Sequence, residues 1–146
     1  MSISRILVVG AGQMGAGIAQ VAAQAEIAVT LTDISVDYAR RGLDRISKAL
    51  SRLVDKGRLT TEQKDSILSR IVVAPDLEAA ARGADLVIEA IVEDPAAKSD
   101  LWSRLADICP PDVIFASNTS SISITSMARD SRRADRFIGM HFMNPV

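Results

Sequence analysis

The chain has 146 residues, of which 48% are hydrophobic and 24% charged, values typical of one globular domain with a substantial core. Its net charge of −1 gives no sign of binding to nucleic acid or to an anionic membrane, and no apolar run reaches the roughly 18 residues that span a bilayer. The single cysteine, Cys109, excludes an internal disulfide, and with no signal-peptide pattern at the start it favours a cytoplasmic location.

The first predicted elements are a strand over Arg5–Val9 and a helix over Gly12–Gln24. They meet at the segment GAGQMG, residues 10–15, which fits the pattern G-x-G-x-x-G. A strand that enters this pattern and leaves it as a helix is typical of a dinucleotide-binding turn, because the free N–H groups of the helix face a pyrophosphate. We expect Gly10 to permit the tight turn, Gly12 to let the phosphates approach, and Gly15 to let the helix pack against the sheet.

A second strand, Ala28–Thr32, is followed directly by Asp33, 18 residues after Gly15. An acid near this spacing accepts a hydrogen bond from the ribose 2′-hydroxyl of NAD and repels the 2′-phosphate of NADP. Arg40 and Arg41 follow only at helical positions beyond the turn, so we predict NAD as the cofactor. The alternative is a glycine-rich turn with a solvent-exposed Asp33 that caps the next helix.

The middle of the chain predicts a helical hairpin. A long helix over Ser35–Lys56 is expected to end at a left-handed Gly57. The residues Thr60 to Gln63 resemble a capping box that begins a second helix, which ends near Ser69. Two helices are more than a simple strand-to-strand crossover needs, so we expect the pair to project from the sheet.

The remaining elements continue to alternate between strand and helix. The predicted strands are Ile71–Val73, Asp85–Ile91, Val113–Ala116 and Phe137–His141, and the predicted helices are Leu77–Ala81, Pro95–Ile108 and one that begins near Ile122. This alternation predicts an α/β fold of the Rossmann type, a doubly wound, mostly parallel sheet with helices on both faces. Ligands of such sheets bind at the carboxyl ends of the strands.

Three polar segments follow predicted strands at that edge, and each has a plain alternative. Glu93 and Lys98 come after the strand that begins at Asp85, but they could be a solvated pair of little energetic value. Ser120 lies in a Ser/Thr/Asn run that could simply cap a helix. His141, followed by Asn144, is the single histidine, and a lone histidine is more often structural than catalytic. No metal site is expected.

Four stretches together resemble one family. They are GAGQMGAGIAQ at 10–20, EAIVE at 89–93, FASNTSS at 115–121 and DRFIGMHFMNP at 135–145. In this order they resemble the N-terminal NAD-binding domain of the L-3-hydroxyacyl-CoA dehydrogenases, which include the 3-hydroxybutyryl-CoA dehydrogenases. The resemblance implies reversible oxidation of an (S)-3-hydroxyacyl-CoA to the 3-oxoacyl-CoA with NAD as hydride acceptor, as in the β-oxidation of fatty acids.

The resemblance also implies a role for each matching residue. His141 is the expected general base, and Ser120 the hydroxyl that contacts the substrate oxygen and the nicotinamide side. Lys56, on the hairpin, is expected to face the phosphates of CoA. The expected cofactor contacts are Gly10, Gly12, Gln13, Met14, Gly15, Asp33, Glu93, Lys98, Ser120 and Asn144.

The chain departs from the family pattern in three places. Ala25-Glu26 stands where a glycine is usual, and Ala49 stands where some members have a serine that contacts CoA. The sequence also stops at Val146, whereas the family continues with a glutamate that orients the histidine and with a helical domain for substrate binding and dimerisation. We therefore expect residues 1–146 to be an NAD-binding domain, inactive alone, of a homodimeric enzyme. The alternatives are a non-catalytic NAD-binding or structural module and another NAD-dependent hydroxy-acid dehydrogenase.

Overall fold

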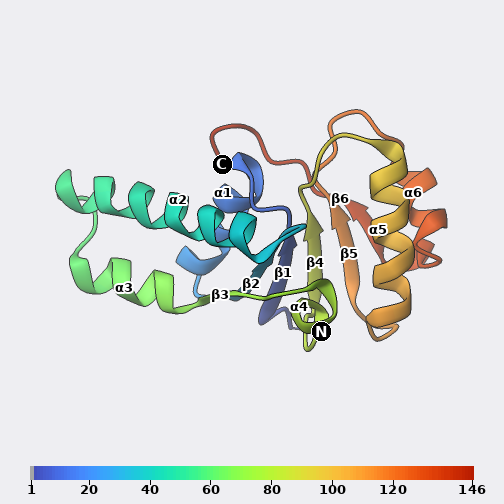
Figure 1. Cartoon of the computed structure of the whole chain (residues 1–146), viewed down its shortest axis with the longest axis horizontal. Coiled ribbons are helices and arrows are strands. Elements are labelled where there is room, and N and C mark those ends of the chain that lie inside the picture. Colours follow the sequence, from blue (N-terminus) through green and yellow to red (C-terminus); the bar gives the residue numbers. More distant parts are fainter. Residues whose placement is uncertain (1) are drawn as a thin grey trace.

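One sheet of six parallel strands forms the centre of the computed structural model, which describes residues 2–146. The strand order is β3-β2-β1-β4-β5-β6 (Figure 1). The strands are β1 (Arg5–Val9), β2 (Ala28–Thr32), β3 (Ile71–Val73), β4 (Leu86–Glu89), β5 (Ile114–Ser117) and β6 (Phe137–Gly139). The chain winds outward from β1 in one direction and then from β4 in the other, so the predicted doubly wound sheet is confirmed.

Each face of the sheet carries its own core because neighbouring side chains of a strand point to opposite faces. In β1, Ile6 and Val8 belong to the core under α1 (Gln13–Gln24), α2 (Val36–Asp55) and α3 (Thr61–Ser69). Leu7 and Val9 belong to the opposite core, under α4 (Leu77–Ala81), α5 (Pro95–Ile108) and α6 (Ile124–Asp130). Burial on both faces explains why β1 is a continuous apolar run rather than an alternating one.

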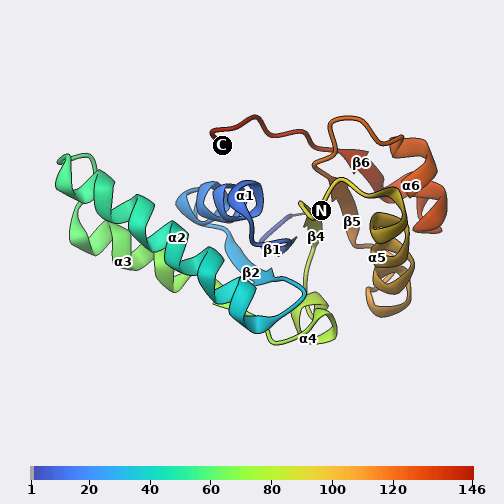
Figure 2. The same cartoon turned by 45° about the horizontal axis from the view of Figure 1, so that its top comes forward.

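The helices α2 and α3 form the expected hairpin, which extends beyond the sheet (Figures 1 and 2). Ser35 caps α2 by accepting a hydrogen bond from the N–H of Tyr38 at 3.3 Å. Gly57 follows α2 with φ of 69°, and the capping box of Thr60 and Gln63 begins α3, as predicted. The 20-residue α2 is polar on its outer face, and among residues 2–146 no helix combines the length and apolarity that crossing a bilayer requires.

Several predicted boundaries differ from the structure at the carboxyl edge of the sheet. The strand predicted over Asp85–Ile91 ends at Glu89, because the Glu89 carboxylate accepts the N–H of Ile91 and turns the chain away. The strand predicted to reach His141 ends at Gly139, which is paired with Ser117, the last residue of β5. β5 covers Ile114–Ser117 and α6 begins at Ile124 rather than near Ile122. A short 3₁₀ helix over Ala134–Arg136 was not predicted.

Candidate functional site

The backbone of the glycine turn between β1 and α1 is closely packed, both within the turn and against Ala90, the residue after β4. Gly10 has φ of 101°, and a Cβ there would lie 2.5 Å from the carbonyl oxygen of Ala90. A Cβ on Gly15 would overlap the carbonyl oxygen of Gly10. Gly15 is therefore required by close packing of the helix on the turn itself, not only on the sheet as the sequence suggested.

Gly12 differs from both, because a Cβ there would meet no atom of the described chain within 4 Å. It is the N-cap residue of α1, and within residues 2–146 the backbone N–H groups of Gly12, Gln13 and Met14 have no acceptor. Free N–H groups and the positive end of the helix dipole together favour an anion. The open space and the donor set therefore fit the pyrophosphate of a dinucleotide.

Asp33 lies at the end of β2, directly beside this turn. One carboxylate oxygen accepts the N–H of Ala11 at 2.7 Å, and the other accepts that of Ile34 at 2.7 Å. The alternative in which Asp33 caps the next helix is wrong, because Ser35 fills that position. Since an ionised carboxylate has about four lone-pair sites, Asp33 can still accept ribose hydroxyls.

A cleft of about 350 Å³ opens next to Asp33. The hydroxyl oxygen of Thr32, in its lining, is buried and has no hydrogen-bond partner in the described part of the chain. Apolar walls with a few polar groups suit a flat aromatic ring such as adenine. The lining residues are Val9, Thr32, Asp33, Ile34, Pro75, Asp76, Leu77, Ile91, Ala97, Asp100, Leu101 and Arg104.

A buried charge network joins the ends of β4 and β5 to α5. The Lys98 ammonium lies 3.0 Å from the Glu89 carboxylate and 3.4 Å from that of Glu93. Lys98 is only 1% exposed and Glu89 is fully buried, so the alternative of a solvated Glu93–Lys98 pair is wrong. The hydroxyl of Ser117 donates to Glu89 at 2.5 Å, and that of Thr119 donates to Glu93.

The network also sets the charge of Glu93. Partial burial opposes ionisation, but the Thr119 hydroxyl and the Lys98 ammonium outweigh it and hold the pKa of Glu93 below its ordinary value. Glu93 is therefore an ionised acceptor at the rim of the site. Lys98, by contrast, lies beneath it, so its expected cofactor contact would be made through Glu93.

The expected catalytic residues line a second cleft, of about 320 Å³. Asn118 shapes it, because its side-chain oxygen accepts the N–H of Phe142 at 2.7 Å and so fixes the segment after His141. Gln13 reaches across from α1 and donates to the side chain of Asn144 at 3.1 Å. The lining residues are Met14, Ala90, Ile91, Glu93, Asn118, Ser120, His141, Phe142, Met143 and Asn144.

Sequence reasoning placed Glu89, Ser117, Asn118 and Thr119 within the stretches at 89–93 and 115–121 but assigned none of them a role. The signal was present in one case: Glu89 ends an otherwise apolar strand, and a carboxylate in such a position needs a buried partner. Within the described residues, no group of three His, Cys, Asp or Glu side chains could hold a metal ion.

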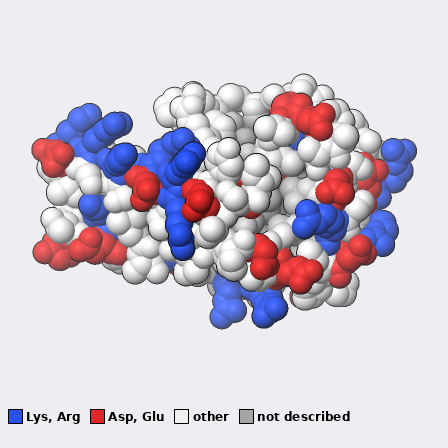
Figure 3. Space-filling view, viewed as in Figure 1, with Lys and Arg blue, Asp and Glu red and all other residues white. Residues whose placement is uncertain are grey.

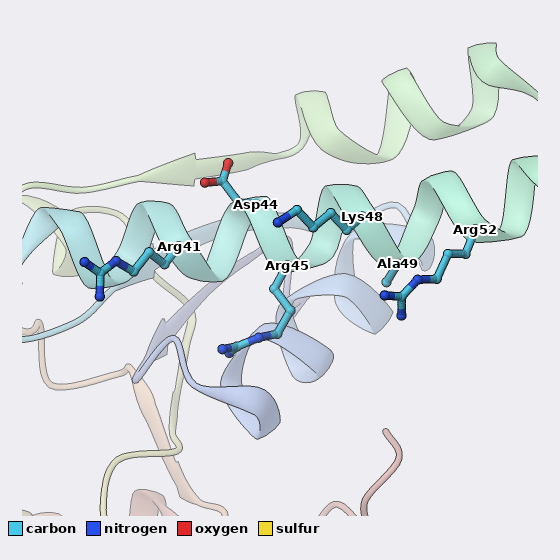
Figure 4. Close-up of a pocket in the computed structure, with 6 residues that line it drawn as sticks. All are labelled: Arg41, Asp44, Arg45, Lys48, Ala49 and Arg52. Carbon is cyan, nitrogen blue, oxygen red and sulfur yellow. The ribbon is translucent and has the colours of Figure 1, made fainter.

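A basic groove of about 320 Å³ on α2 was also not anticipated. Lys and Arg side chains gather over this helix on the face shown in Figure 3. The groove is lined by Arg41, Asp44, Arg45, Lys48, Ala49 and Arg52, drawn in Figure 4. Lys56 lies just beyond it, as the exposed C-cap residue of α2.

Comparison with known proteins connects this geometry to a family. Residues 5–146 match the family model described as the NAD binding domain of 3-hydroxyacyl-CoA dehydrogenase. A probable 3-hydroxybutyryl-CoA dehydrogenase of Bacillus subtilis is 49% identical over 146 residues, all of this chain and 50% of that protein. One from Deinococcus radiodurans is 50% identical over 139 residues, 95% of this chain and 49% of that protein.

The similar solved structures belong to the same family as the sequence relatives. An (S)-3-hydroxybutyryl-CoA dehydrogenase from Ralstonia eutropha superposes with a TM-score of 0.95 at 43% identity, over 99% of this chain and 51% of that one. A 3-hydroxybutyryl-CoA dehydrogenase from Escherichia coli gives a TM-score of 0.93 at 42% identity, over 99% of this chain and 30% of that one. The chain thus spans about half the length of the curated relatives it matches first.

Proposed function

Because the chain belongs to the 3-hydroxyacyl-CoA dehydrogenase family as its NAD-binding domain, we propose that it is part of an enzyme that interconverts (S)-3-hydroxyacyl-CoA and 3-oxoacyl-CoA. NAD is the cofactor of this domain family. One observation carries the proposal: His141, Ser120 and Asn144 border the same cleft as Met14 of the glycine turn. A base and a cofactor-binding turn at one cleft suit removal of a proton and a hydride from the same alcohol.

NAD, when bound, supplies the acceptor for the hydride that leaves C3 of the substrate. We propose that Gly12, Gln13 and Met14 hold its pyrophosphate through their free N–H groups, and that Asp33 accepts the adenosine ribose. The cleft beside Asp33 then takes the adenine ring. Glu93 and Asn144, at the rim of the second cleft, are the proposed contacts for the nicotinamide ribose.

The proton chemistry is assigned to His141. Its imidazole takes the proton of the 3-hydroxyl as the hydride leaves, and returns it in the reverse direction. Ser120, on the same cleft, donates a hydrogen bond to the substrate oxygen. Asn118 supports the role of His141 because it fixes the backbone of Phe142, the next residue.

The basic side chains of α2 support the proposal that the substrate is an acyl-CoA. The groove and the exposed Lys56 beyond it offer the cations that phosphate groups bind. We further propose that the complete enzyme works in the cytoplasm as a homodimer and that a second, helical domain closes over the substrate.

The test is steady-state kinetics of the complete protein with acetoacetyl-CoA and NADH. The variant His141→Ala should lower kcat by about 10²–10⁴-fold while the Kd of NADH stays within about twofold, because a general base acts in the transition state. Lys56→Ala should instead raise the KM for the CoA ester with kcat nearly unchanged. A His141→Ala variant with near-normal kcat would show that the histidine is structural.

A further inference from the structure

Helix α2 packs directly on the glycine turn. A Cβ built on Gly42 would lie 2.7 Å from the Cβ of Ala11 and 2.8 Å from its carbonyl oxygen, so only a glycine lets the helix approach this closely. Ala11 itself is buried, 4% exposed. The first turns of α2 therefore form one wall of the turn that receives the cofactor phosphates.

The two peptide groups that flank Ala11 are held from opposite partners. The N–H of Ala11 donates to Asp33 at 2.7 Å, while its carbonyl oxygen accepts a hydrogen bond from the guanidinium of Arg45 at 3.3 Å. Arg45 comes from α2, and Figure 4 shows its side chain extending from that helix toward α1. The turn is thus tied both to β2 and to α2.

The second of these bonds has a geometric consequence for Gly12. The carbonyl of Ala11 and the N–H of Gly12 belong to one planar trans peptide, so they point in opposite directions. A donor that fixes the carbonyl therefore also fixes the direction of the Gly12 N–H, which has no acceptor within residues 2–146. We propose that Arg45 is a positioning residue for the cofactor, which holds the Ala11–Gly12 peptide so that its N–H is presented to the pyrophosphate.

Arg45 differs in this respect from the other basic side chains of the groove. Arg41, Lys48 and Arg52 also line it, but within the described residues Arg45 is the one that bonds to the glycine turn. Arg45 also lines an adjoining cleft over α1, together with Gln13 and Asn144. Because Arg45 lies between the basic groove and this cleft, a residue of the groove can act on the cofactor site. The inference rests on the proposed cofactor site.

The experiment compares cofactor fragments in Arg45 variants of the 146-residue chain. Calorimetry with NADH and ADP-ribose, both of which carry the pyrophosphate, is set against NMR titration with adenosine, which lacks it. Arg45→Met should raise the Kd of NADH and ADP-ribose about five- to tenfold, the scale of one partly exposed charged hydrogen bond. The Kd of adenosine should change less than twofold. Arg45→Lys, which keeps a donor of similar reach, should recover most of the loss.

Arg40→Met is the matched control, because Arg40 is an exposed residue of the same helix and the substitution changes the net charge equally. It should leave all three Kd values unchanged. The loss in Arg45→Met should persist at about 0.5 M salt, where attraction between exposed charges is largely screened. An unchanged Kd of NADH in Arg45→Met, an equal loss in Arg40→Met, an equal loss for adenosine, or a loss that disappears at high salt would each overturn the inference. Failure of the unsubstituted chain to bind NADH or ADP-ribose would overturn the proposed function and the inference with it.

Discussion

Both carboxylate oxygens of Asp33 already accept backbone hydrogen bonds, from Ala11 and Ile34. The side chain is therefore fixed before any ligand arrives, and its remaining lone pairs face a ligand without further loss of rotamer freedom. Its negative charge at this point also disfavours a second phosphate on the ribose. We therefore propose that Asp33 contributes both to the affinity for the cofactor and to the choice of NAD over NADP.

We predict that Asp33→Ala weakens binding of NAD by about 1–3 kcal/mol, the cost of a lost charged hydrogen bond. The preference for NADH over NADPH should fall at the same time. Calorimetry with both reduced cofactors measures the two effects. Asp37→Ala, in the first turn of α2, removes an exposed carboxylate nearby and serves as the control. Equal binding of NADH and NADPH by the unsubstituted chain would contradict the assignment of Asp33.

Lys98 illustrates a residue whose role depends on burial. It is 1% exposed and faces two carboxylates, so its removal would leave the fully buried Glu89 without a counterion. We predict that Lys98→Met lowers the free energy of unfolding by about 3–5 kcal/mol, the range for breaking a buried pair. Urea denaturation measures this change. The double variant Lys98→Met/Glu89→Gln should recover part of the lost stability, because it removes the unpaired buried charge. A Lys98→Met variant as stable as the parent would show that the Lys98–Glu89 pair does not stabilise the fold.

The residues of the site divide into those that local spacing predicts and those that it does not. Gly10, Gly12 and Asp33 belong to one strand–helix–strand unit, which brings the turn after its first strand and the acid after its second strand together, so their proximity needs no knowledge of the rest of the fold. Glu89 and Lys98 are nine positions apart, and whether they are buried depends on how α5 packs under β4 and β5. The sequence pattern alone could not distinguish a buried Lys98 from one that forms a solvated ion pair.

At the scale of elements, predictions succeeded where a local chemical signal marks the boundary. Thr60 and Gln63 form the predicted capping box, and Gly57 adopts the left-handed conformation that ends α2. The predicted ends of β4 and β6 were too late, because the Glu89 carboxylate turns the chain after β4 and the partner strand of β6, β5, stops at Ser117. The length of a parallel strand is set by its neighbours, and their identity is not visible in its own sequence.

The packing of α2 on the glycine turn leads to a prediction in which two effects oppose each other. An alanine in a helix interior is normally favoured over glycine by about 0.5–1 kcal/mol. At Gly42, however, the new methyl group would meet buried Ala11 at 2.7 Å, and overpacking of this kind costs about 1–3 kcal/mol. We predict that Gly42→Ala is net destabilising, by about 1 kcal/mol, in urea denaturation. A stabilised variant would mean that α2 can move away from the turn at little cost.

At the scale of the whole molecule, the strand order decides where ligands can bind. The chain leaves β1 toward β2 and β3, then crosses to β4 and continues toward β6, so the loops after β1 and β4 diverge and leave a crevice between them. Alternating strand and helix patterns predicted this crevice and the side of the sheet on which it opens. The basic groove was not predicted, although Arg41, Arg45, Lys48 and Arg52 recur at the three- and four-residue spacings that place side chains along one helix face, because a row of charges is equally typical of an ordinary solvent-exposed face.

The last prediction concerns the 146-residue chain by itself. His141 is exposed, and within residues 2–146 no group accepts a hydrogen bond from its imidazole, so neither its tautomer nor its orientation is held. A general base needs both, and positioning of the reactants can supply about 7–11 kcal/mol of a reaction barrier. We therefore expect this chain to bind NADH but to reduce acetoacetyl-CoA slowly or not at all.

Loss of NADH absorbance at high protein concentration measures that rate, with His141→Ala as the control for background reduction. The two proteins should give the same low rate, because an unoriented imidazole adds little to the reaction. Rapid turnover that disappears in His141→Ala would instead mean that the cleft bordered by Ser120, His141 and Asn144 is sufficient for catalysis. In that case the proposed second domain would contribute substrate affinity rather than the orientation of the base.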